Sequence, residues 1–232
     1  MVRILIPVLL VLLIYAPYFY VRYVYQSNNK TLKLMPFDGR EFAKKILKEN
    51  NLNDIKINPQ DQSLQNFYDP INRSIGIEKK LLENRSLTSI SIIAHEVGHA
   101  IQHKENYQPL LTRHILLEKS NIFRSIGSSI VTLGLGPIFA FTQSIYLTLI
   151  ASLVALLFFC FEIFINIFTL RCEYDASFNR AMPLLKKYIP KEYMDACKQV
   201  LNAAALTYIA NSILRIISFR NFFYIFIRLL KK

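Results

Sequence analysis

The chain has 232 residues, enough for one domain with a sizeable core and too few for several. Hydrophobic residues make up 53% of it and the formal net charge is +12, but basic and acidic residues are interspersed and no nucleic-acid-binding signature is present. The composition argues against a nucleic-acid partner and favours a membrane protein, in which excess Lys and Arg marks the cytoplasmic side. The three cysteines form no CxxC pair, so we expect no disulfide framework and a reducing compartment.

The N-terminal segment, residues 1–25, predicts a transmembrane anchor. Residues 4–21 are apolar over a length that can span a bilayer. A signal peptide, the competing interpretation, would end in a cleavage site of small residues, whereas Arg22 and several tyrosines follow this run. We therefore expect the anchor to stay uncleaved.

Residues 26–120 are polar and predict the soluble part of the protein. Residues 37–51, FDGREFAKKILKENN, have the periodicity of an amphipathic helix. Short alternating runs that follow this helix flank the turn sequence DPINRS and predict a small antiparallel sheet. Residues 87–103, LTSISIIAHEVGHAIQH, predict a second helix with Ser86 or Thr88 as its N-cap.

The stretch 121–170 is almost uncharged and too long for a single membrane span. The sequence GLGP, residues 134–137, interrupts it near the middle. This pattern predicts a transmembrane helical hairpin with arms at about 121–140 and 144–170.

Beyond the hairpin, residues 171–207 are polar again, and residues 208–232 predict a basic apolar helix that lies at the interface or spans the membrane. A hairpin crosses the membrane twice, so residues 26–120 and 171–207 would share one side, which the positive-inside rule places in the cytoplasm. We expect an α+β fold in a multi-pass protein of the cell membrane. A small antiparallel sheet and a buried helix would combine with the anchor and the transmembrane hairpin.

The sequence AHEVGHAIQH, residues 94–103, holds three of the four histidines of the chain. Positions i and i+4 lie one above the other on a helix, so His95 and His99 direct their imidazoles at a common point. Glu96 lies beside that point, where it can take a proton from water without displacing either histidine, and Gly98 leaves one side of the helix bare. This is the H-E-x-x-H arrangement of zinc metalloproteases, which predicts one catalytic Zn²⁺ with Glu96 as general base.

A catalytic zinc needs three protein ligands and one open position. His103 continues the row of histidines, but it lies a further turn along a rigid helix and reaches the metal poorly. The metzincin pattern would require glycine and histidine at the positions of Gln102 and Glu105, so that class is excluded. Gluzincins take the third ligand from a glutamate on a second helix, and Glu173 in RCEYDAS is the best candidate. A solvated interfacial acid is the alternative for Glu173.

Three more residues are candidates for supporting roles. Asp175 could orient a ligand histidine as a hydrogen-bond acceptor, or it could be an ordinary surface acid. His103 could shape the rim of the site, although a structural histidine is the simpler interpretation. His114, in LLTRHILL, could be a transition-state donor or a plain helix histidine.

Characteristic segments occur in order along nearly the whole chain: YDP at 68–70, AHEVGHAIQH at 94–103, EYDAS at 173–177 and VLNAAALTYIA at 200–210. Together they resemble the YugP-type membrane zinc metallopeptidases of bacteria, the neutral zinc metallopeptidase group within the gluzincins. This resemblance implies an anchored protease domain with His95, His99 and Glu173 on zinc and Glu96 as base. SFNRA, residues 177–181, is one residue longer than the usual spacing of the family.

The sequence thus predicts a membrane-anchored, zinc-dependent metalloendopeptidase that cleaves protein substrates at or near the membrane. Its partners would be a protein or peptide substrate and the lipid bilayer, without nucleic acid, while the oligomeric state stays open. The strand expected at 74–78 would bind the substrate in extended form. One alternative is a catalytically silent metal-binding scaffold, which would have no need of Glu96. A transporter, the other alternative, would need more spans and more polar residues at membrane depth.

Overall fold

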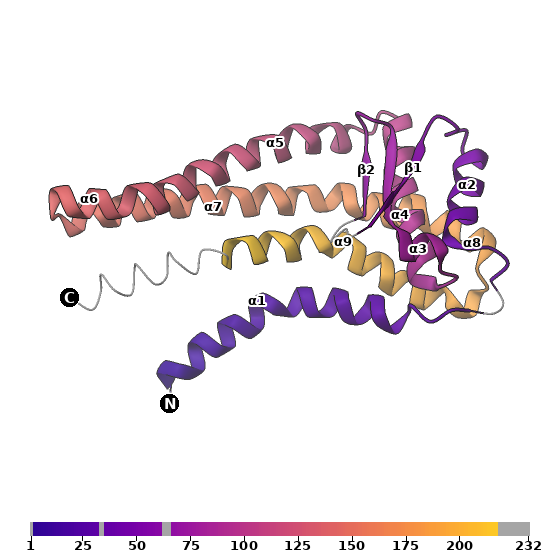
Figure 1. The fold of residues 1–232 in the computed structure, drawn as a ribbon, viewed down its shortest axis with the longest axis horizontal. Helices are drawn as coiled ribbons and strands as arrows, with labels where there is room; N and C mark the ends of the chain where they lie inside the picture. The colour runs from indigo at the N-terminus through magenta and orange to yellow at the C-terminus, as the bar shows by residue number, and fades with distance from the viewer. Residues whose placement is uncertain (1, 33–34, 62–65, 218–232) are drawn as a thin grey trace. The chain divides into compact units, whose positions relative to one another are not determined.

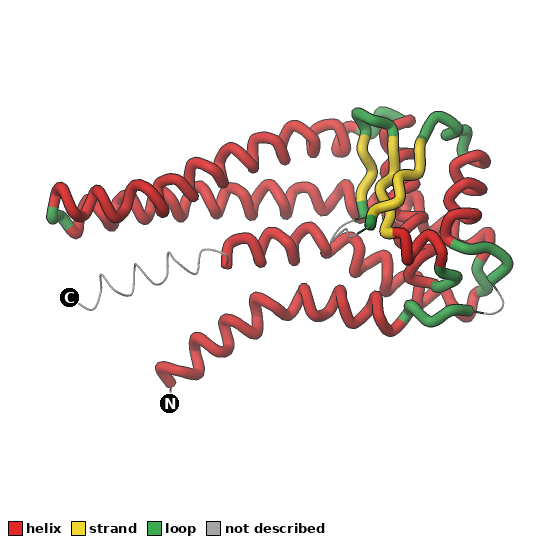
Figure 2. The backbone as a smooth tube through the Cα atoms, in the orientation of Figure 1, coloured by secondary structure: helices red, strands yellow, loops and turns green. Residues whose placement is uncertain are grey.

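A computed structural model describes residues 2–32, 35–61 and 66–217, and most of these residues are helical (Figures 1 and 2). They group into two compact units. Unit 1 comprises Met1–Tyr15, Thr112–Thr169 and Tyr208–Lys232, and unit 2 comprises Ala16–Leu111 and Leu170–Thr207.

Unit 2 contains the sheet and the helices that bury it. Its first part holds the end of α1 (Val2–Ser27), α2 (Gly39–Glu49), β1 (Lys56–Gln60), β2 (Phe67–Asp69), β3 (Ser74–Glu78), α3 (Lys79–Glu83) and α4 (Leu87–Lys104). Its second part holds the end of α7 (Ile145–Tyr174), the π-helix η2 (Asp175–Ala181), α8 (Met182–Tyr188), the 3-10 turn η3 (Lys191–Tyr193) and the start of α9 (Met194–Ile217).

Helix α2 confirms the amphipathic helix predicted from the sequence. At its N-terminus the side chain of Asp38 accepts a hydrogen bond from the backbone N–H of Glu41 at 2.8 Å, and the Glu41 side chain accepts one from the Asp38 N–H at 3.0 Å. This reciprocal capping box satisfies two N–H groups at the helix start. Phe42 and Ile46, one turn apart, are fully buried, so the apolar face of α2 packs into the core.

The sheet has the strand order β1-β3-β2, and it is mixed instead of antiparallel (Figure 2). β2 and β3 form an antiparallel pair, in which Tyr68 lies opposite Ile75, whereas β1 runs parallel to β3. The expected small antiparallel sheet is therefore wrong for one of its two pairings. The physical reason is the order of the strands. β2 runs opposite to both β1 and β3, and because β3 lies between β1 and β2, the two strands that run in the same direction become neighbours.

The central position of β3 also overturns the expected substrate-binding role of residues 74–78. Both edges of β3 are already hydrogen-bonded to neighbouring strands, so no peptide can add to it. Its first four residues are buried, as expected for a strand covered on both faces.

Helix α4 runs through the core of unit 2 and is buried along most of its length. Ile90 and Ile93 of α4 are fully inaccessible to solvent. They belong to one buried cluster with Ile77 of β3, Leu185 of α8 and Leu201 of α9. A helix that is buried on nearly all sides has its side chains held by the surrounding packing, so the core restricts the positions of the buried side chains of α4.

Unit 1, within the residues described, is helical. Its elements are the start of α1, most of α5 (Gln108–Ser129), the π-helix η1 (Ile130–Gly134), α6 (Leu135–Thr142), most of α7 and the end of α9. α5 lies beside α7, since the ring of Phe123 contacts those of Phe158 and Phe161 at centroid distances of 5.8 and 4.7 Å. A small buried cluster is formed by Val131 of η1, Leu135 of α6 and Ala155 of α7.

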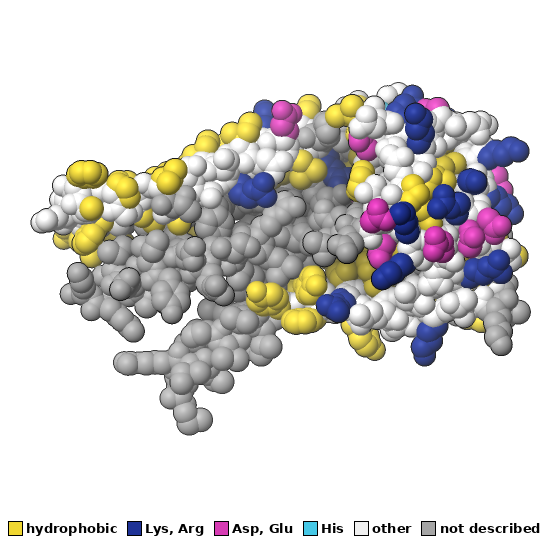
Figure 3. Space-filling model, in the orientation of Figure 1, with side chains coloured by type: hydrophobic (Ala, Val, Ile, Leu, Met, Phe, Trp, Pro, Cys, Tyr) yellow, Lys and Arg dark blue, Asp and Glu magenta, His cyan; other side chains and the backbone are white. Residues whose placement is uncertain are grey.

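Many large apolar side chains of unit 1 face outward. Leu133, Phe141 and Leu157 are 74%, 89% and 62% exposed. Figure 3 shows apolar side chains along the unit 1 helices, whereas basic and acidic side chains are interspersed over the visible face of unit 2.

In the part of the chain that the structure describes, no helix combines the length and the apolar character needed to cross a membrane. This finding overturns the expected fold class with a transmembrane anchor and hairpin, and the multi-pass location is not supported. The protein is mostly helical with a small three-stranded sheet. The arm expected at 121–140 is not one continuous α-helix. It is divided between the end of α5, which carries Arg124, the π-helix η1 and α6, which has only eight residues.

Candidate metal centre and active site

Helix α4 begins at an N-cap formed by Ser86, whose hydroxyl oxygen accepts a hydrogen bond from the Ser89 N–H at 3.1 Å. Thr88, the other expected cap, instead donates its hydroxyl proton to the backbone oxygen of Tyr25 at 2.9 Å. These bonds fix the start of the helix that carries the H-E-x-x-H sequence and tie the end of α1 to it.

The structure brings His95, His99 and Glu173 together inside unit 2. The two histidines come from adjacent turns of α4, and Glu173 is the penultimate residue of α7. The carboxylate oxygen Oε2 of Glu173 lies 3.2 Å from Nε2 of His95 and 3.3 Å from Nε2 of His99. All three side chains are buried. Within the described residues, they form a group that could hold a metal ion.

The distances within this group fit a zinc ion. Zn²⁺ lies about 2.0–2.2 Å from histidine nitrogen and carboxylate oxygen, and a tetrahedral site therefore separates two ligand atoms by about 3.3 Å. The two nitrogen–oxygen distances of 3.2 and 3.3 Å have this value. Two imidazoles and one carboxylate are also the ligand set of a catalytic zinc with an open fourth position.

Each histidine is supported at its other ring nitrogen. Nδ1 of His95 lies 2.9 Å from the hydroxyl oxygen of Ser177 in η2, and this hydroxyl donates to the backbone oxygen of Leu201 at 3.3 Å. Nδ1 of His99 lies 2.9 Å from the side-chain oxygen of Gln102. Such bonds hold metal-ligating imidazoles in place and raise their basicity.

Asp175 reaches His99 through Gln102. Its Oδ2 accepts hydrogen bonds from the Gln102 amide at 2.7 Å and from Arg180 at 3.2 Å, and its Oδ1 accepts one from Asn179 at 2.7 Å. Burial opposes ionisation of Asp175, but the hydrogen bonds and the positive charge of Arg180 outweigh it. The pKa of Asp175 therefore lies below its usual value. Arg180 also pairs with Glu105 at the end of α4.

Glu96 is buried and follows His95 directly on α4. Tyr25, near the end of α1, lies within electrostatic reach of the site. Burial and then the carboxylates of Glu96 and Glu173 raise the pKa of the Tyr25 phenol well above its usual value. The Tyr25 phenol therefore keeps its proton at neutral pH.

The remaining histidines lie in different surroundings. Nδ1 of His103 forms a hydrogen bond with the hydroxyl of Tyr68 at 2.7 Å, which links α4 to β2. His103 is half-buried, one turn beyond His99. His114 lies in α5, and its side chain is outside the described part of the structure.

Gly98 allows η2 to approach α4. A Cβ atom at Gly98 would lie 2.5 Å from the backbone oxygen of Ala176, a distance that no side chain can adopt without moving η2. Residues 177–181 lie in the π-helix η2, where a turn holds more residues than a turn of an α-helix.

Sequence reasoning missed three groups around the site: Gln102, Ser177 and Tyr25. Gln102 was within reach of prediction, since it lies three residues after His99 on the same helix face. Ser177 and Tyr25 carry no local signal, because segments distant in the sequence bring them to α4.

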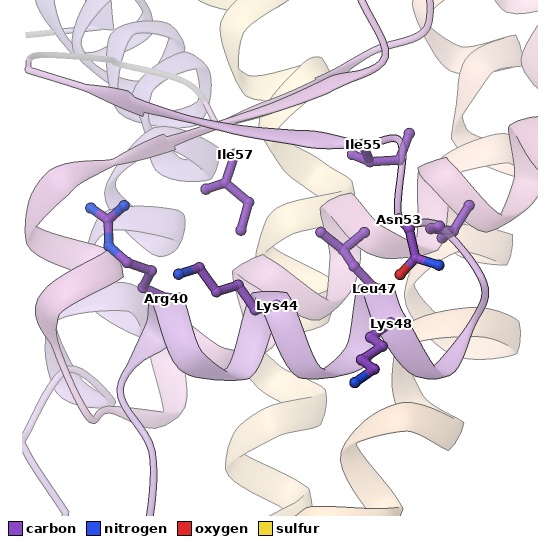
Figure 4. Close-up of a pocket in the computed structure, with 8 residues that line it drawn as sticks. Arg40, Lys44, Leu47, Lys48, Asn53, Ile55 and Ile57 are labelled. Atoms are coloured by element: carbon purple, nitrogen blue, oxygen red, sulfur yellow. The ribbon is translucent and has the colours of Figure 1, made fainter.

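A separate basic pocket lies between α2 and β1, with a volume of about 400 Å³ (Figure 4). Arg40, Lys44 and Lys48 line it together with apolar side chains such as Ile55 and Ile57. Its lining residues include no histidine, cysteine or carboxylate, so it is distinct from the metal centre.

A helix-borne H-E-x-x-H sequence joined by a glutamate from a second helix defines the class of zinc metallopeptidases. Comparison with known proteins agrees. The family model described as "Putative neutral zinc metallopeptidase" matches residues 2–227, and the chain belongs to this family. The chain is 32% identical over 215 residues to "Putative membrane protease YugP" of Bacillus subtilis (strain 168). The matched stretch covers 90% of this chain and 91% of that protein. No solved structure matches the chain.

Membership of this family confirms the resemblance seen in the sequence. It identifies the protein as a zinc protease that uses Zn²⁺ and acts on protein or peptide substrates.

Proposed function

We propose that the protein is a metalloendopeptidase in which His95, His99 and Glu173 hold the zinc ion and Glu96 is the general base. The observation that carries this proposal is the convergence of two Nε2 atoms on one carboxylate oxygen at 3.2 and 3.3 Å. The hydrogen bonds at Nδ1 of both histidines strengthen the proposal, because they leave each Nε2 facing the common point.

Zinc held by His95, His99 and Glu173 would supply a Lewis acid that polarises the scissile carbonyl and lowers the pKa of water. Glu96 accepts a proton as water attacks the carbonyl carbon, and it then delivers this proton to the nitrogen of the departing amine. Burial of Glu96 keeps competing solvent away from the proton transfer.

We also propose that the substrate binds in extended form along β2. In the described residues β2 pairs with β3 along one edge, which leaves the other edge for backbone hydrogen bonds with a peptide. The bond between Tyr68 and His103 holds β2 against the helix that carries the site. A flexible protein segment is the substrate that suits an edge strand, since a folded domain presents no free backbone.

We also propose that the protein associates with a membrane. The relative from Bacillus subtilis is named a membrane protease. In this chain the support is the outward-facing apolar surface of unit 1, where Leu153 and Leu157 are 59% and 62% exposed. In the described residues Cys160, Cys172 and Cys197 form no disulfide. We expect the full chain to float with liposomes in a density gradient, and recovery of the soluble protein at the bottom would contradict this part.

The proposed reaction is tested with the purified full-length chain and an unstructured protein substrate such as casein. The wild type should cleave it, whereas Glu96→Gln should retain zinc and lose cleavage. Glu83→Gln, at an exposed acid of α3, is the matched control and should cleave normally. Comparison of protein N-termini in membranes from cells carrying either chain then identifies substrates. Equal cleavage by Glu96→Gln would contradict the role of Glu96, and an inactive but zinc-loaded wild type would favour the scaffold alternative.

A further inference from the structure

The basic pocket between α2 and β1 has no part in the proposed reaction, and charges of one sign line it (Figure 4). Its cations are Arg40, Lys44 and Lys48, which lie four positions apart on α2 and are called the basic row below. Its other lining residues are uncharged: Leu47, Leu52, Asn53, Ile55 and Ile57. A hollow of about 400 Å³ with cations and no carboxylate in its lining suits a negatively charged ligand.

The acids nearest to the pocket in the sequence are engaged elsewhere. Asp54, which lies between two lining residues, pairs with Arg73 at 2.6 Å. On α2 itself, Glu41 caps the start of the helix and Glu49 interacts with the phenol of Tyr188. Among the described residues, no member of the basic row takes part in an ion pair. The positive charge of the pocket therefore remains available to a ligand.

The length of the basic row favours an extended ligand over a compact one. A helix rises about 1.5 Å per residue, so neighbouring members of the row are about 6 Å apart along α2 and the whole row covers about 12 Å. Figure 4 shows the charged groups spread along α2 instead of gathered at one point. In an extended peptide, side chains two residues apart lie on one face, about 6.4–6.8 Å from each other. Carboxylates at alternate positions of such a peptide therefore meet successive members of the row.

Strand β1 forms the other wall of the pocket and offers little backbone recognition. The Lys56 N–H donates to the backbone oxygen of Arg73, just before β3, at 3.0 Å. The alternate residues Ile57 and Pro59 therefore turn their backbone groups away from β3. Pro59 has no N–H, so this edge of the sheet is poorly suited to an added strand. The side chains of the basic row, and not the backbone of β1, are left to carry recognition.

We propose that this pocket binds an extended segment of a partner protein that carries Asp or Glu at alternate positions. A second copy of this chain does not supply such a segment, because its only acids two positions apart are Glu173 and Asp175, which are buried. The pocket lies at the β1 edge of the sheet, whereas the substrate is proposed to bind along the β2 edge. The partner segment and the substrate therefore use different edges.

The test uses the purified full-length chain carrying Glu96→Gln, so that a peptide probe stays intact. The protein has no tryptophan, and Asn53→Trp, at an exposed lining residue, supplies a single fluorescent reporter of the pocket. The probe is a short peptide of Thr with three Glu at alternate positions. The control peptide has the same composition with Glu at every third position, which turns successive carboxylates to opposite faces.

The alternating peptide should change the tryptophan fluorescence saturably and bind about fivefold more tightly than the control peptide, because it forms more ion pairs with the row. Added salt should weaken this binding. A reporter placed elsewhere, Gln199→Trp on the exposed face of α9, should not respond.

Charge removal locates the binding site. Arg40→Gln/Lys44→Gln should weaken binding of the alternating peptide by about fivefold or more, since each exposed ion pair contributes up to about fivefold. Lys186→Gln/Lys187→Gln removes the same charge at exposed lysines of α8 outside the pocket, and it should bind the peptide as the parent chain does. If the double variant at the pocket does not fold, Lys44→Gln alone, at an exposed residue, should weaken binding about two- to fivefold.

Equal affinity for the two peptides would overturn the proposal, as would unchanged affinity in folded Arg40→Gln/Lys44→Gln, or in Lys44→Gln if only that variant folds. A reporter that responds to inorganic phosphate or to phosphatidylglycerol vesicles, but not to the alternating peptide, would also overturn it and assign the pocket to a compact phosphate or a lipid headgroup. The assay requires no cleavage, so its failure leaves the proposed peptidase reaction untouched, and an inactive enzyme leaves the peptide-binding result standing.

Discussion

The two units bury their apolar residues differently. Unit 2 surrounds α4 with a continuous core of side chains from α2, β3, α8 and α9. Among the side chains that the structure describes in unit 1, the buried cluster consists of Val131, Leu135 and Ala155 with two partly buried neighbours. Unit 1 instead presents large apolar side chains to its surroundings, among them Phe141 and Leu157. The difference teaches that apolar composition alone does not identify a core, and that the reactive groups lie where packing fixes side chains most closely.

The largest effect is expected at the proposed metal ligands of unit 2. Glu173→Gln keeps the shape of the side chain but removes its negative charge, so zinc affinity should fall by more than about 100-fold, beyond the usual effect of losing a supporting partner. Chelator competition measures it. Glu192→Gln, at an exposed acid of η3, is the control. Wild-type affinity in Glu173→Gln would remove Glu173 from the ligand set.

Truncation of apolar side chains contrasts the two units directly. Leu185 of α8 is fully buried, and Leu185→Ala should reduce the free energy of unfolding by about 2–5 kcal/mol through lost contacts and a cavity. Leu157→Ala in unit 1 removes an exposed side chain and should change it by less than about 0.5 kcal/mol. Denaturant titration of both variants checks the difference. Equal losses would mean that Leu157 is buried in solution.

Two glycines give a matched pair. Gly98→Ala should destabilise the protein by about 1–3 kcal/mol and weaken zinc binding, because the new Cβ displaces the backbone of η2 next to Glu173. Gly136→Ala in α6 meets nothing within 4 Å and should stabilise by up to about 1 kcal/mol through helix propensity. Thermal unfolding compares the two. A Gly98→Ala variant with wild-type stability would show that α4 and η2 are not in close contact.

The smallest effect concerns Tyr68 at alkaline pH. Burial raises the pKa of Tyr68 to about 12, with a lowering contribution from Arg73 and raising contributions from Asp54 and Asp69. The unfolded chain has the ordinary value of about 10, so it releases the proton first. Stability is unaffected below pH 10 and falls as the pH rises from about 10 to about 12. Tyr68→Phe should make that fall shallower, and parallel curves for the two proteins would contradict this.

The parts of the molecule that the sequence predicted well depend on local spacing. The i, i+4 relation of His95 and His99 fixes their geometry on any helix, and the buried residues of α4 follow helical periodicity. Gln102 was missed, although it follows from His99 by the same rule. The mixed sheet was predicted incorrectly, because the strand order depends on which edge of β3 pairs with β2. No short sequence pattern determines that pairing.

The site is harder to predict where it depends on distant segments. Ser177 reaches His95 because η2 packs against the bare side of Gly98, and the length of a π-helical turn is not visible in residue types. The hairpin expected at 121–170 is a different error, because a local pattern predicted a structure that the protein does not form. Its apolar composition was read as two uninterrupted spans, whereas the structure divides the first arm between α5, η1 and α6.

X-ray absorption at the zinc edge of the purified full-length protein tests most directly whether His95, His99 and Glu173 form the metal centre. It should show two imidazole nitrogens and carboxylate or water oxygens at about 2.0–2.2 Å, with one imidazole lost in His99→Ala. A sulfur at about 2.3 Å would contradict the proposed centre, because it would place a cysteine such as the buried Cys172 on the metal.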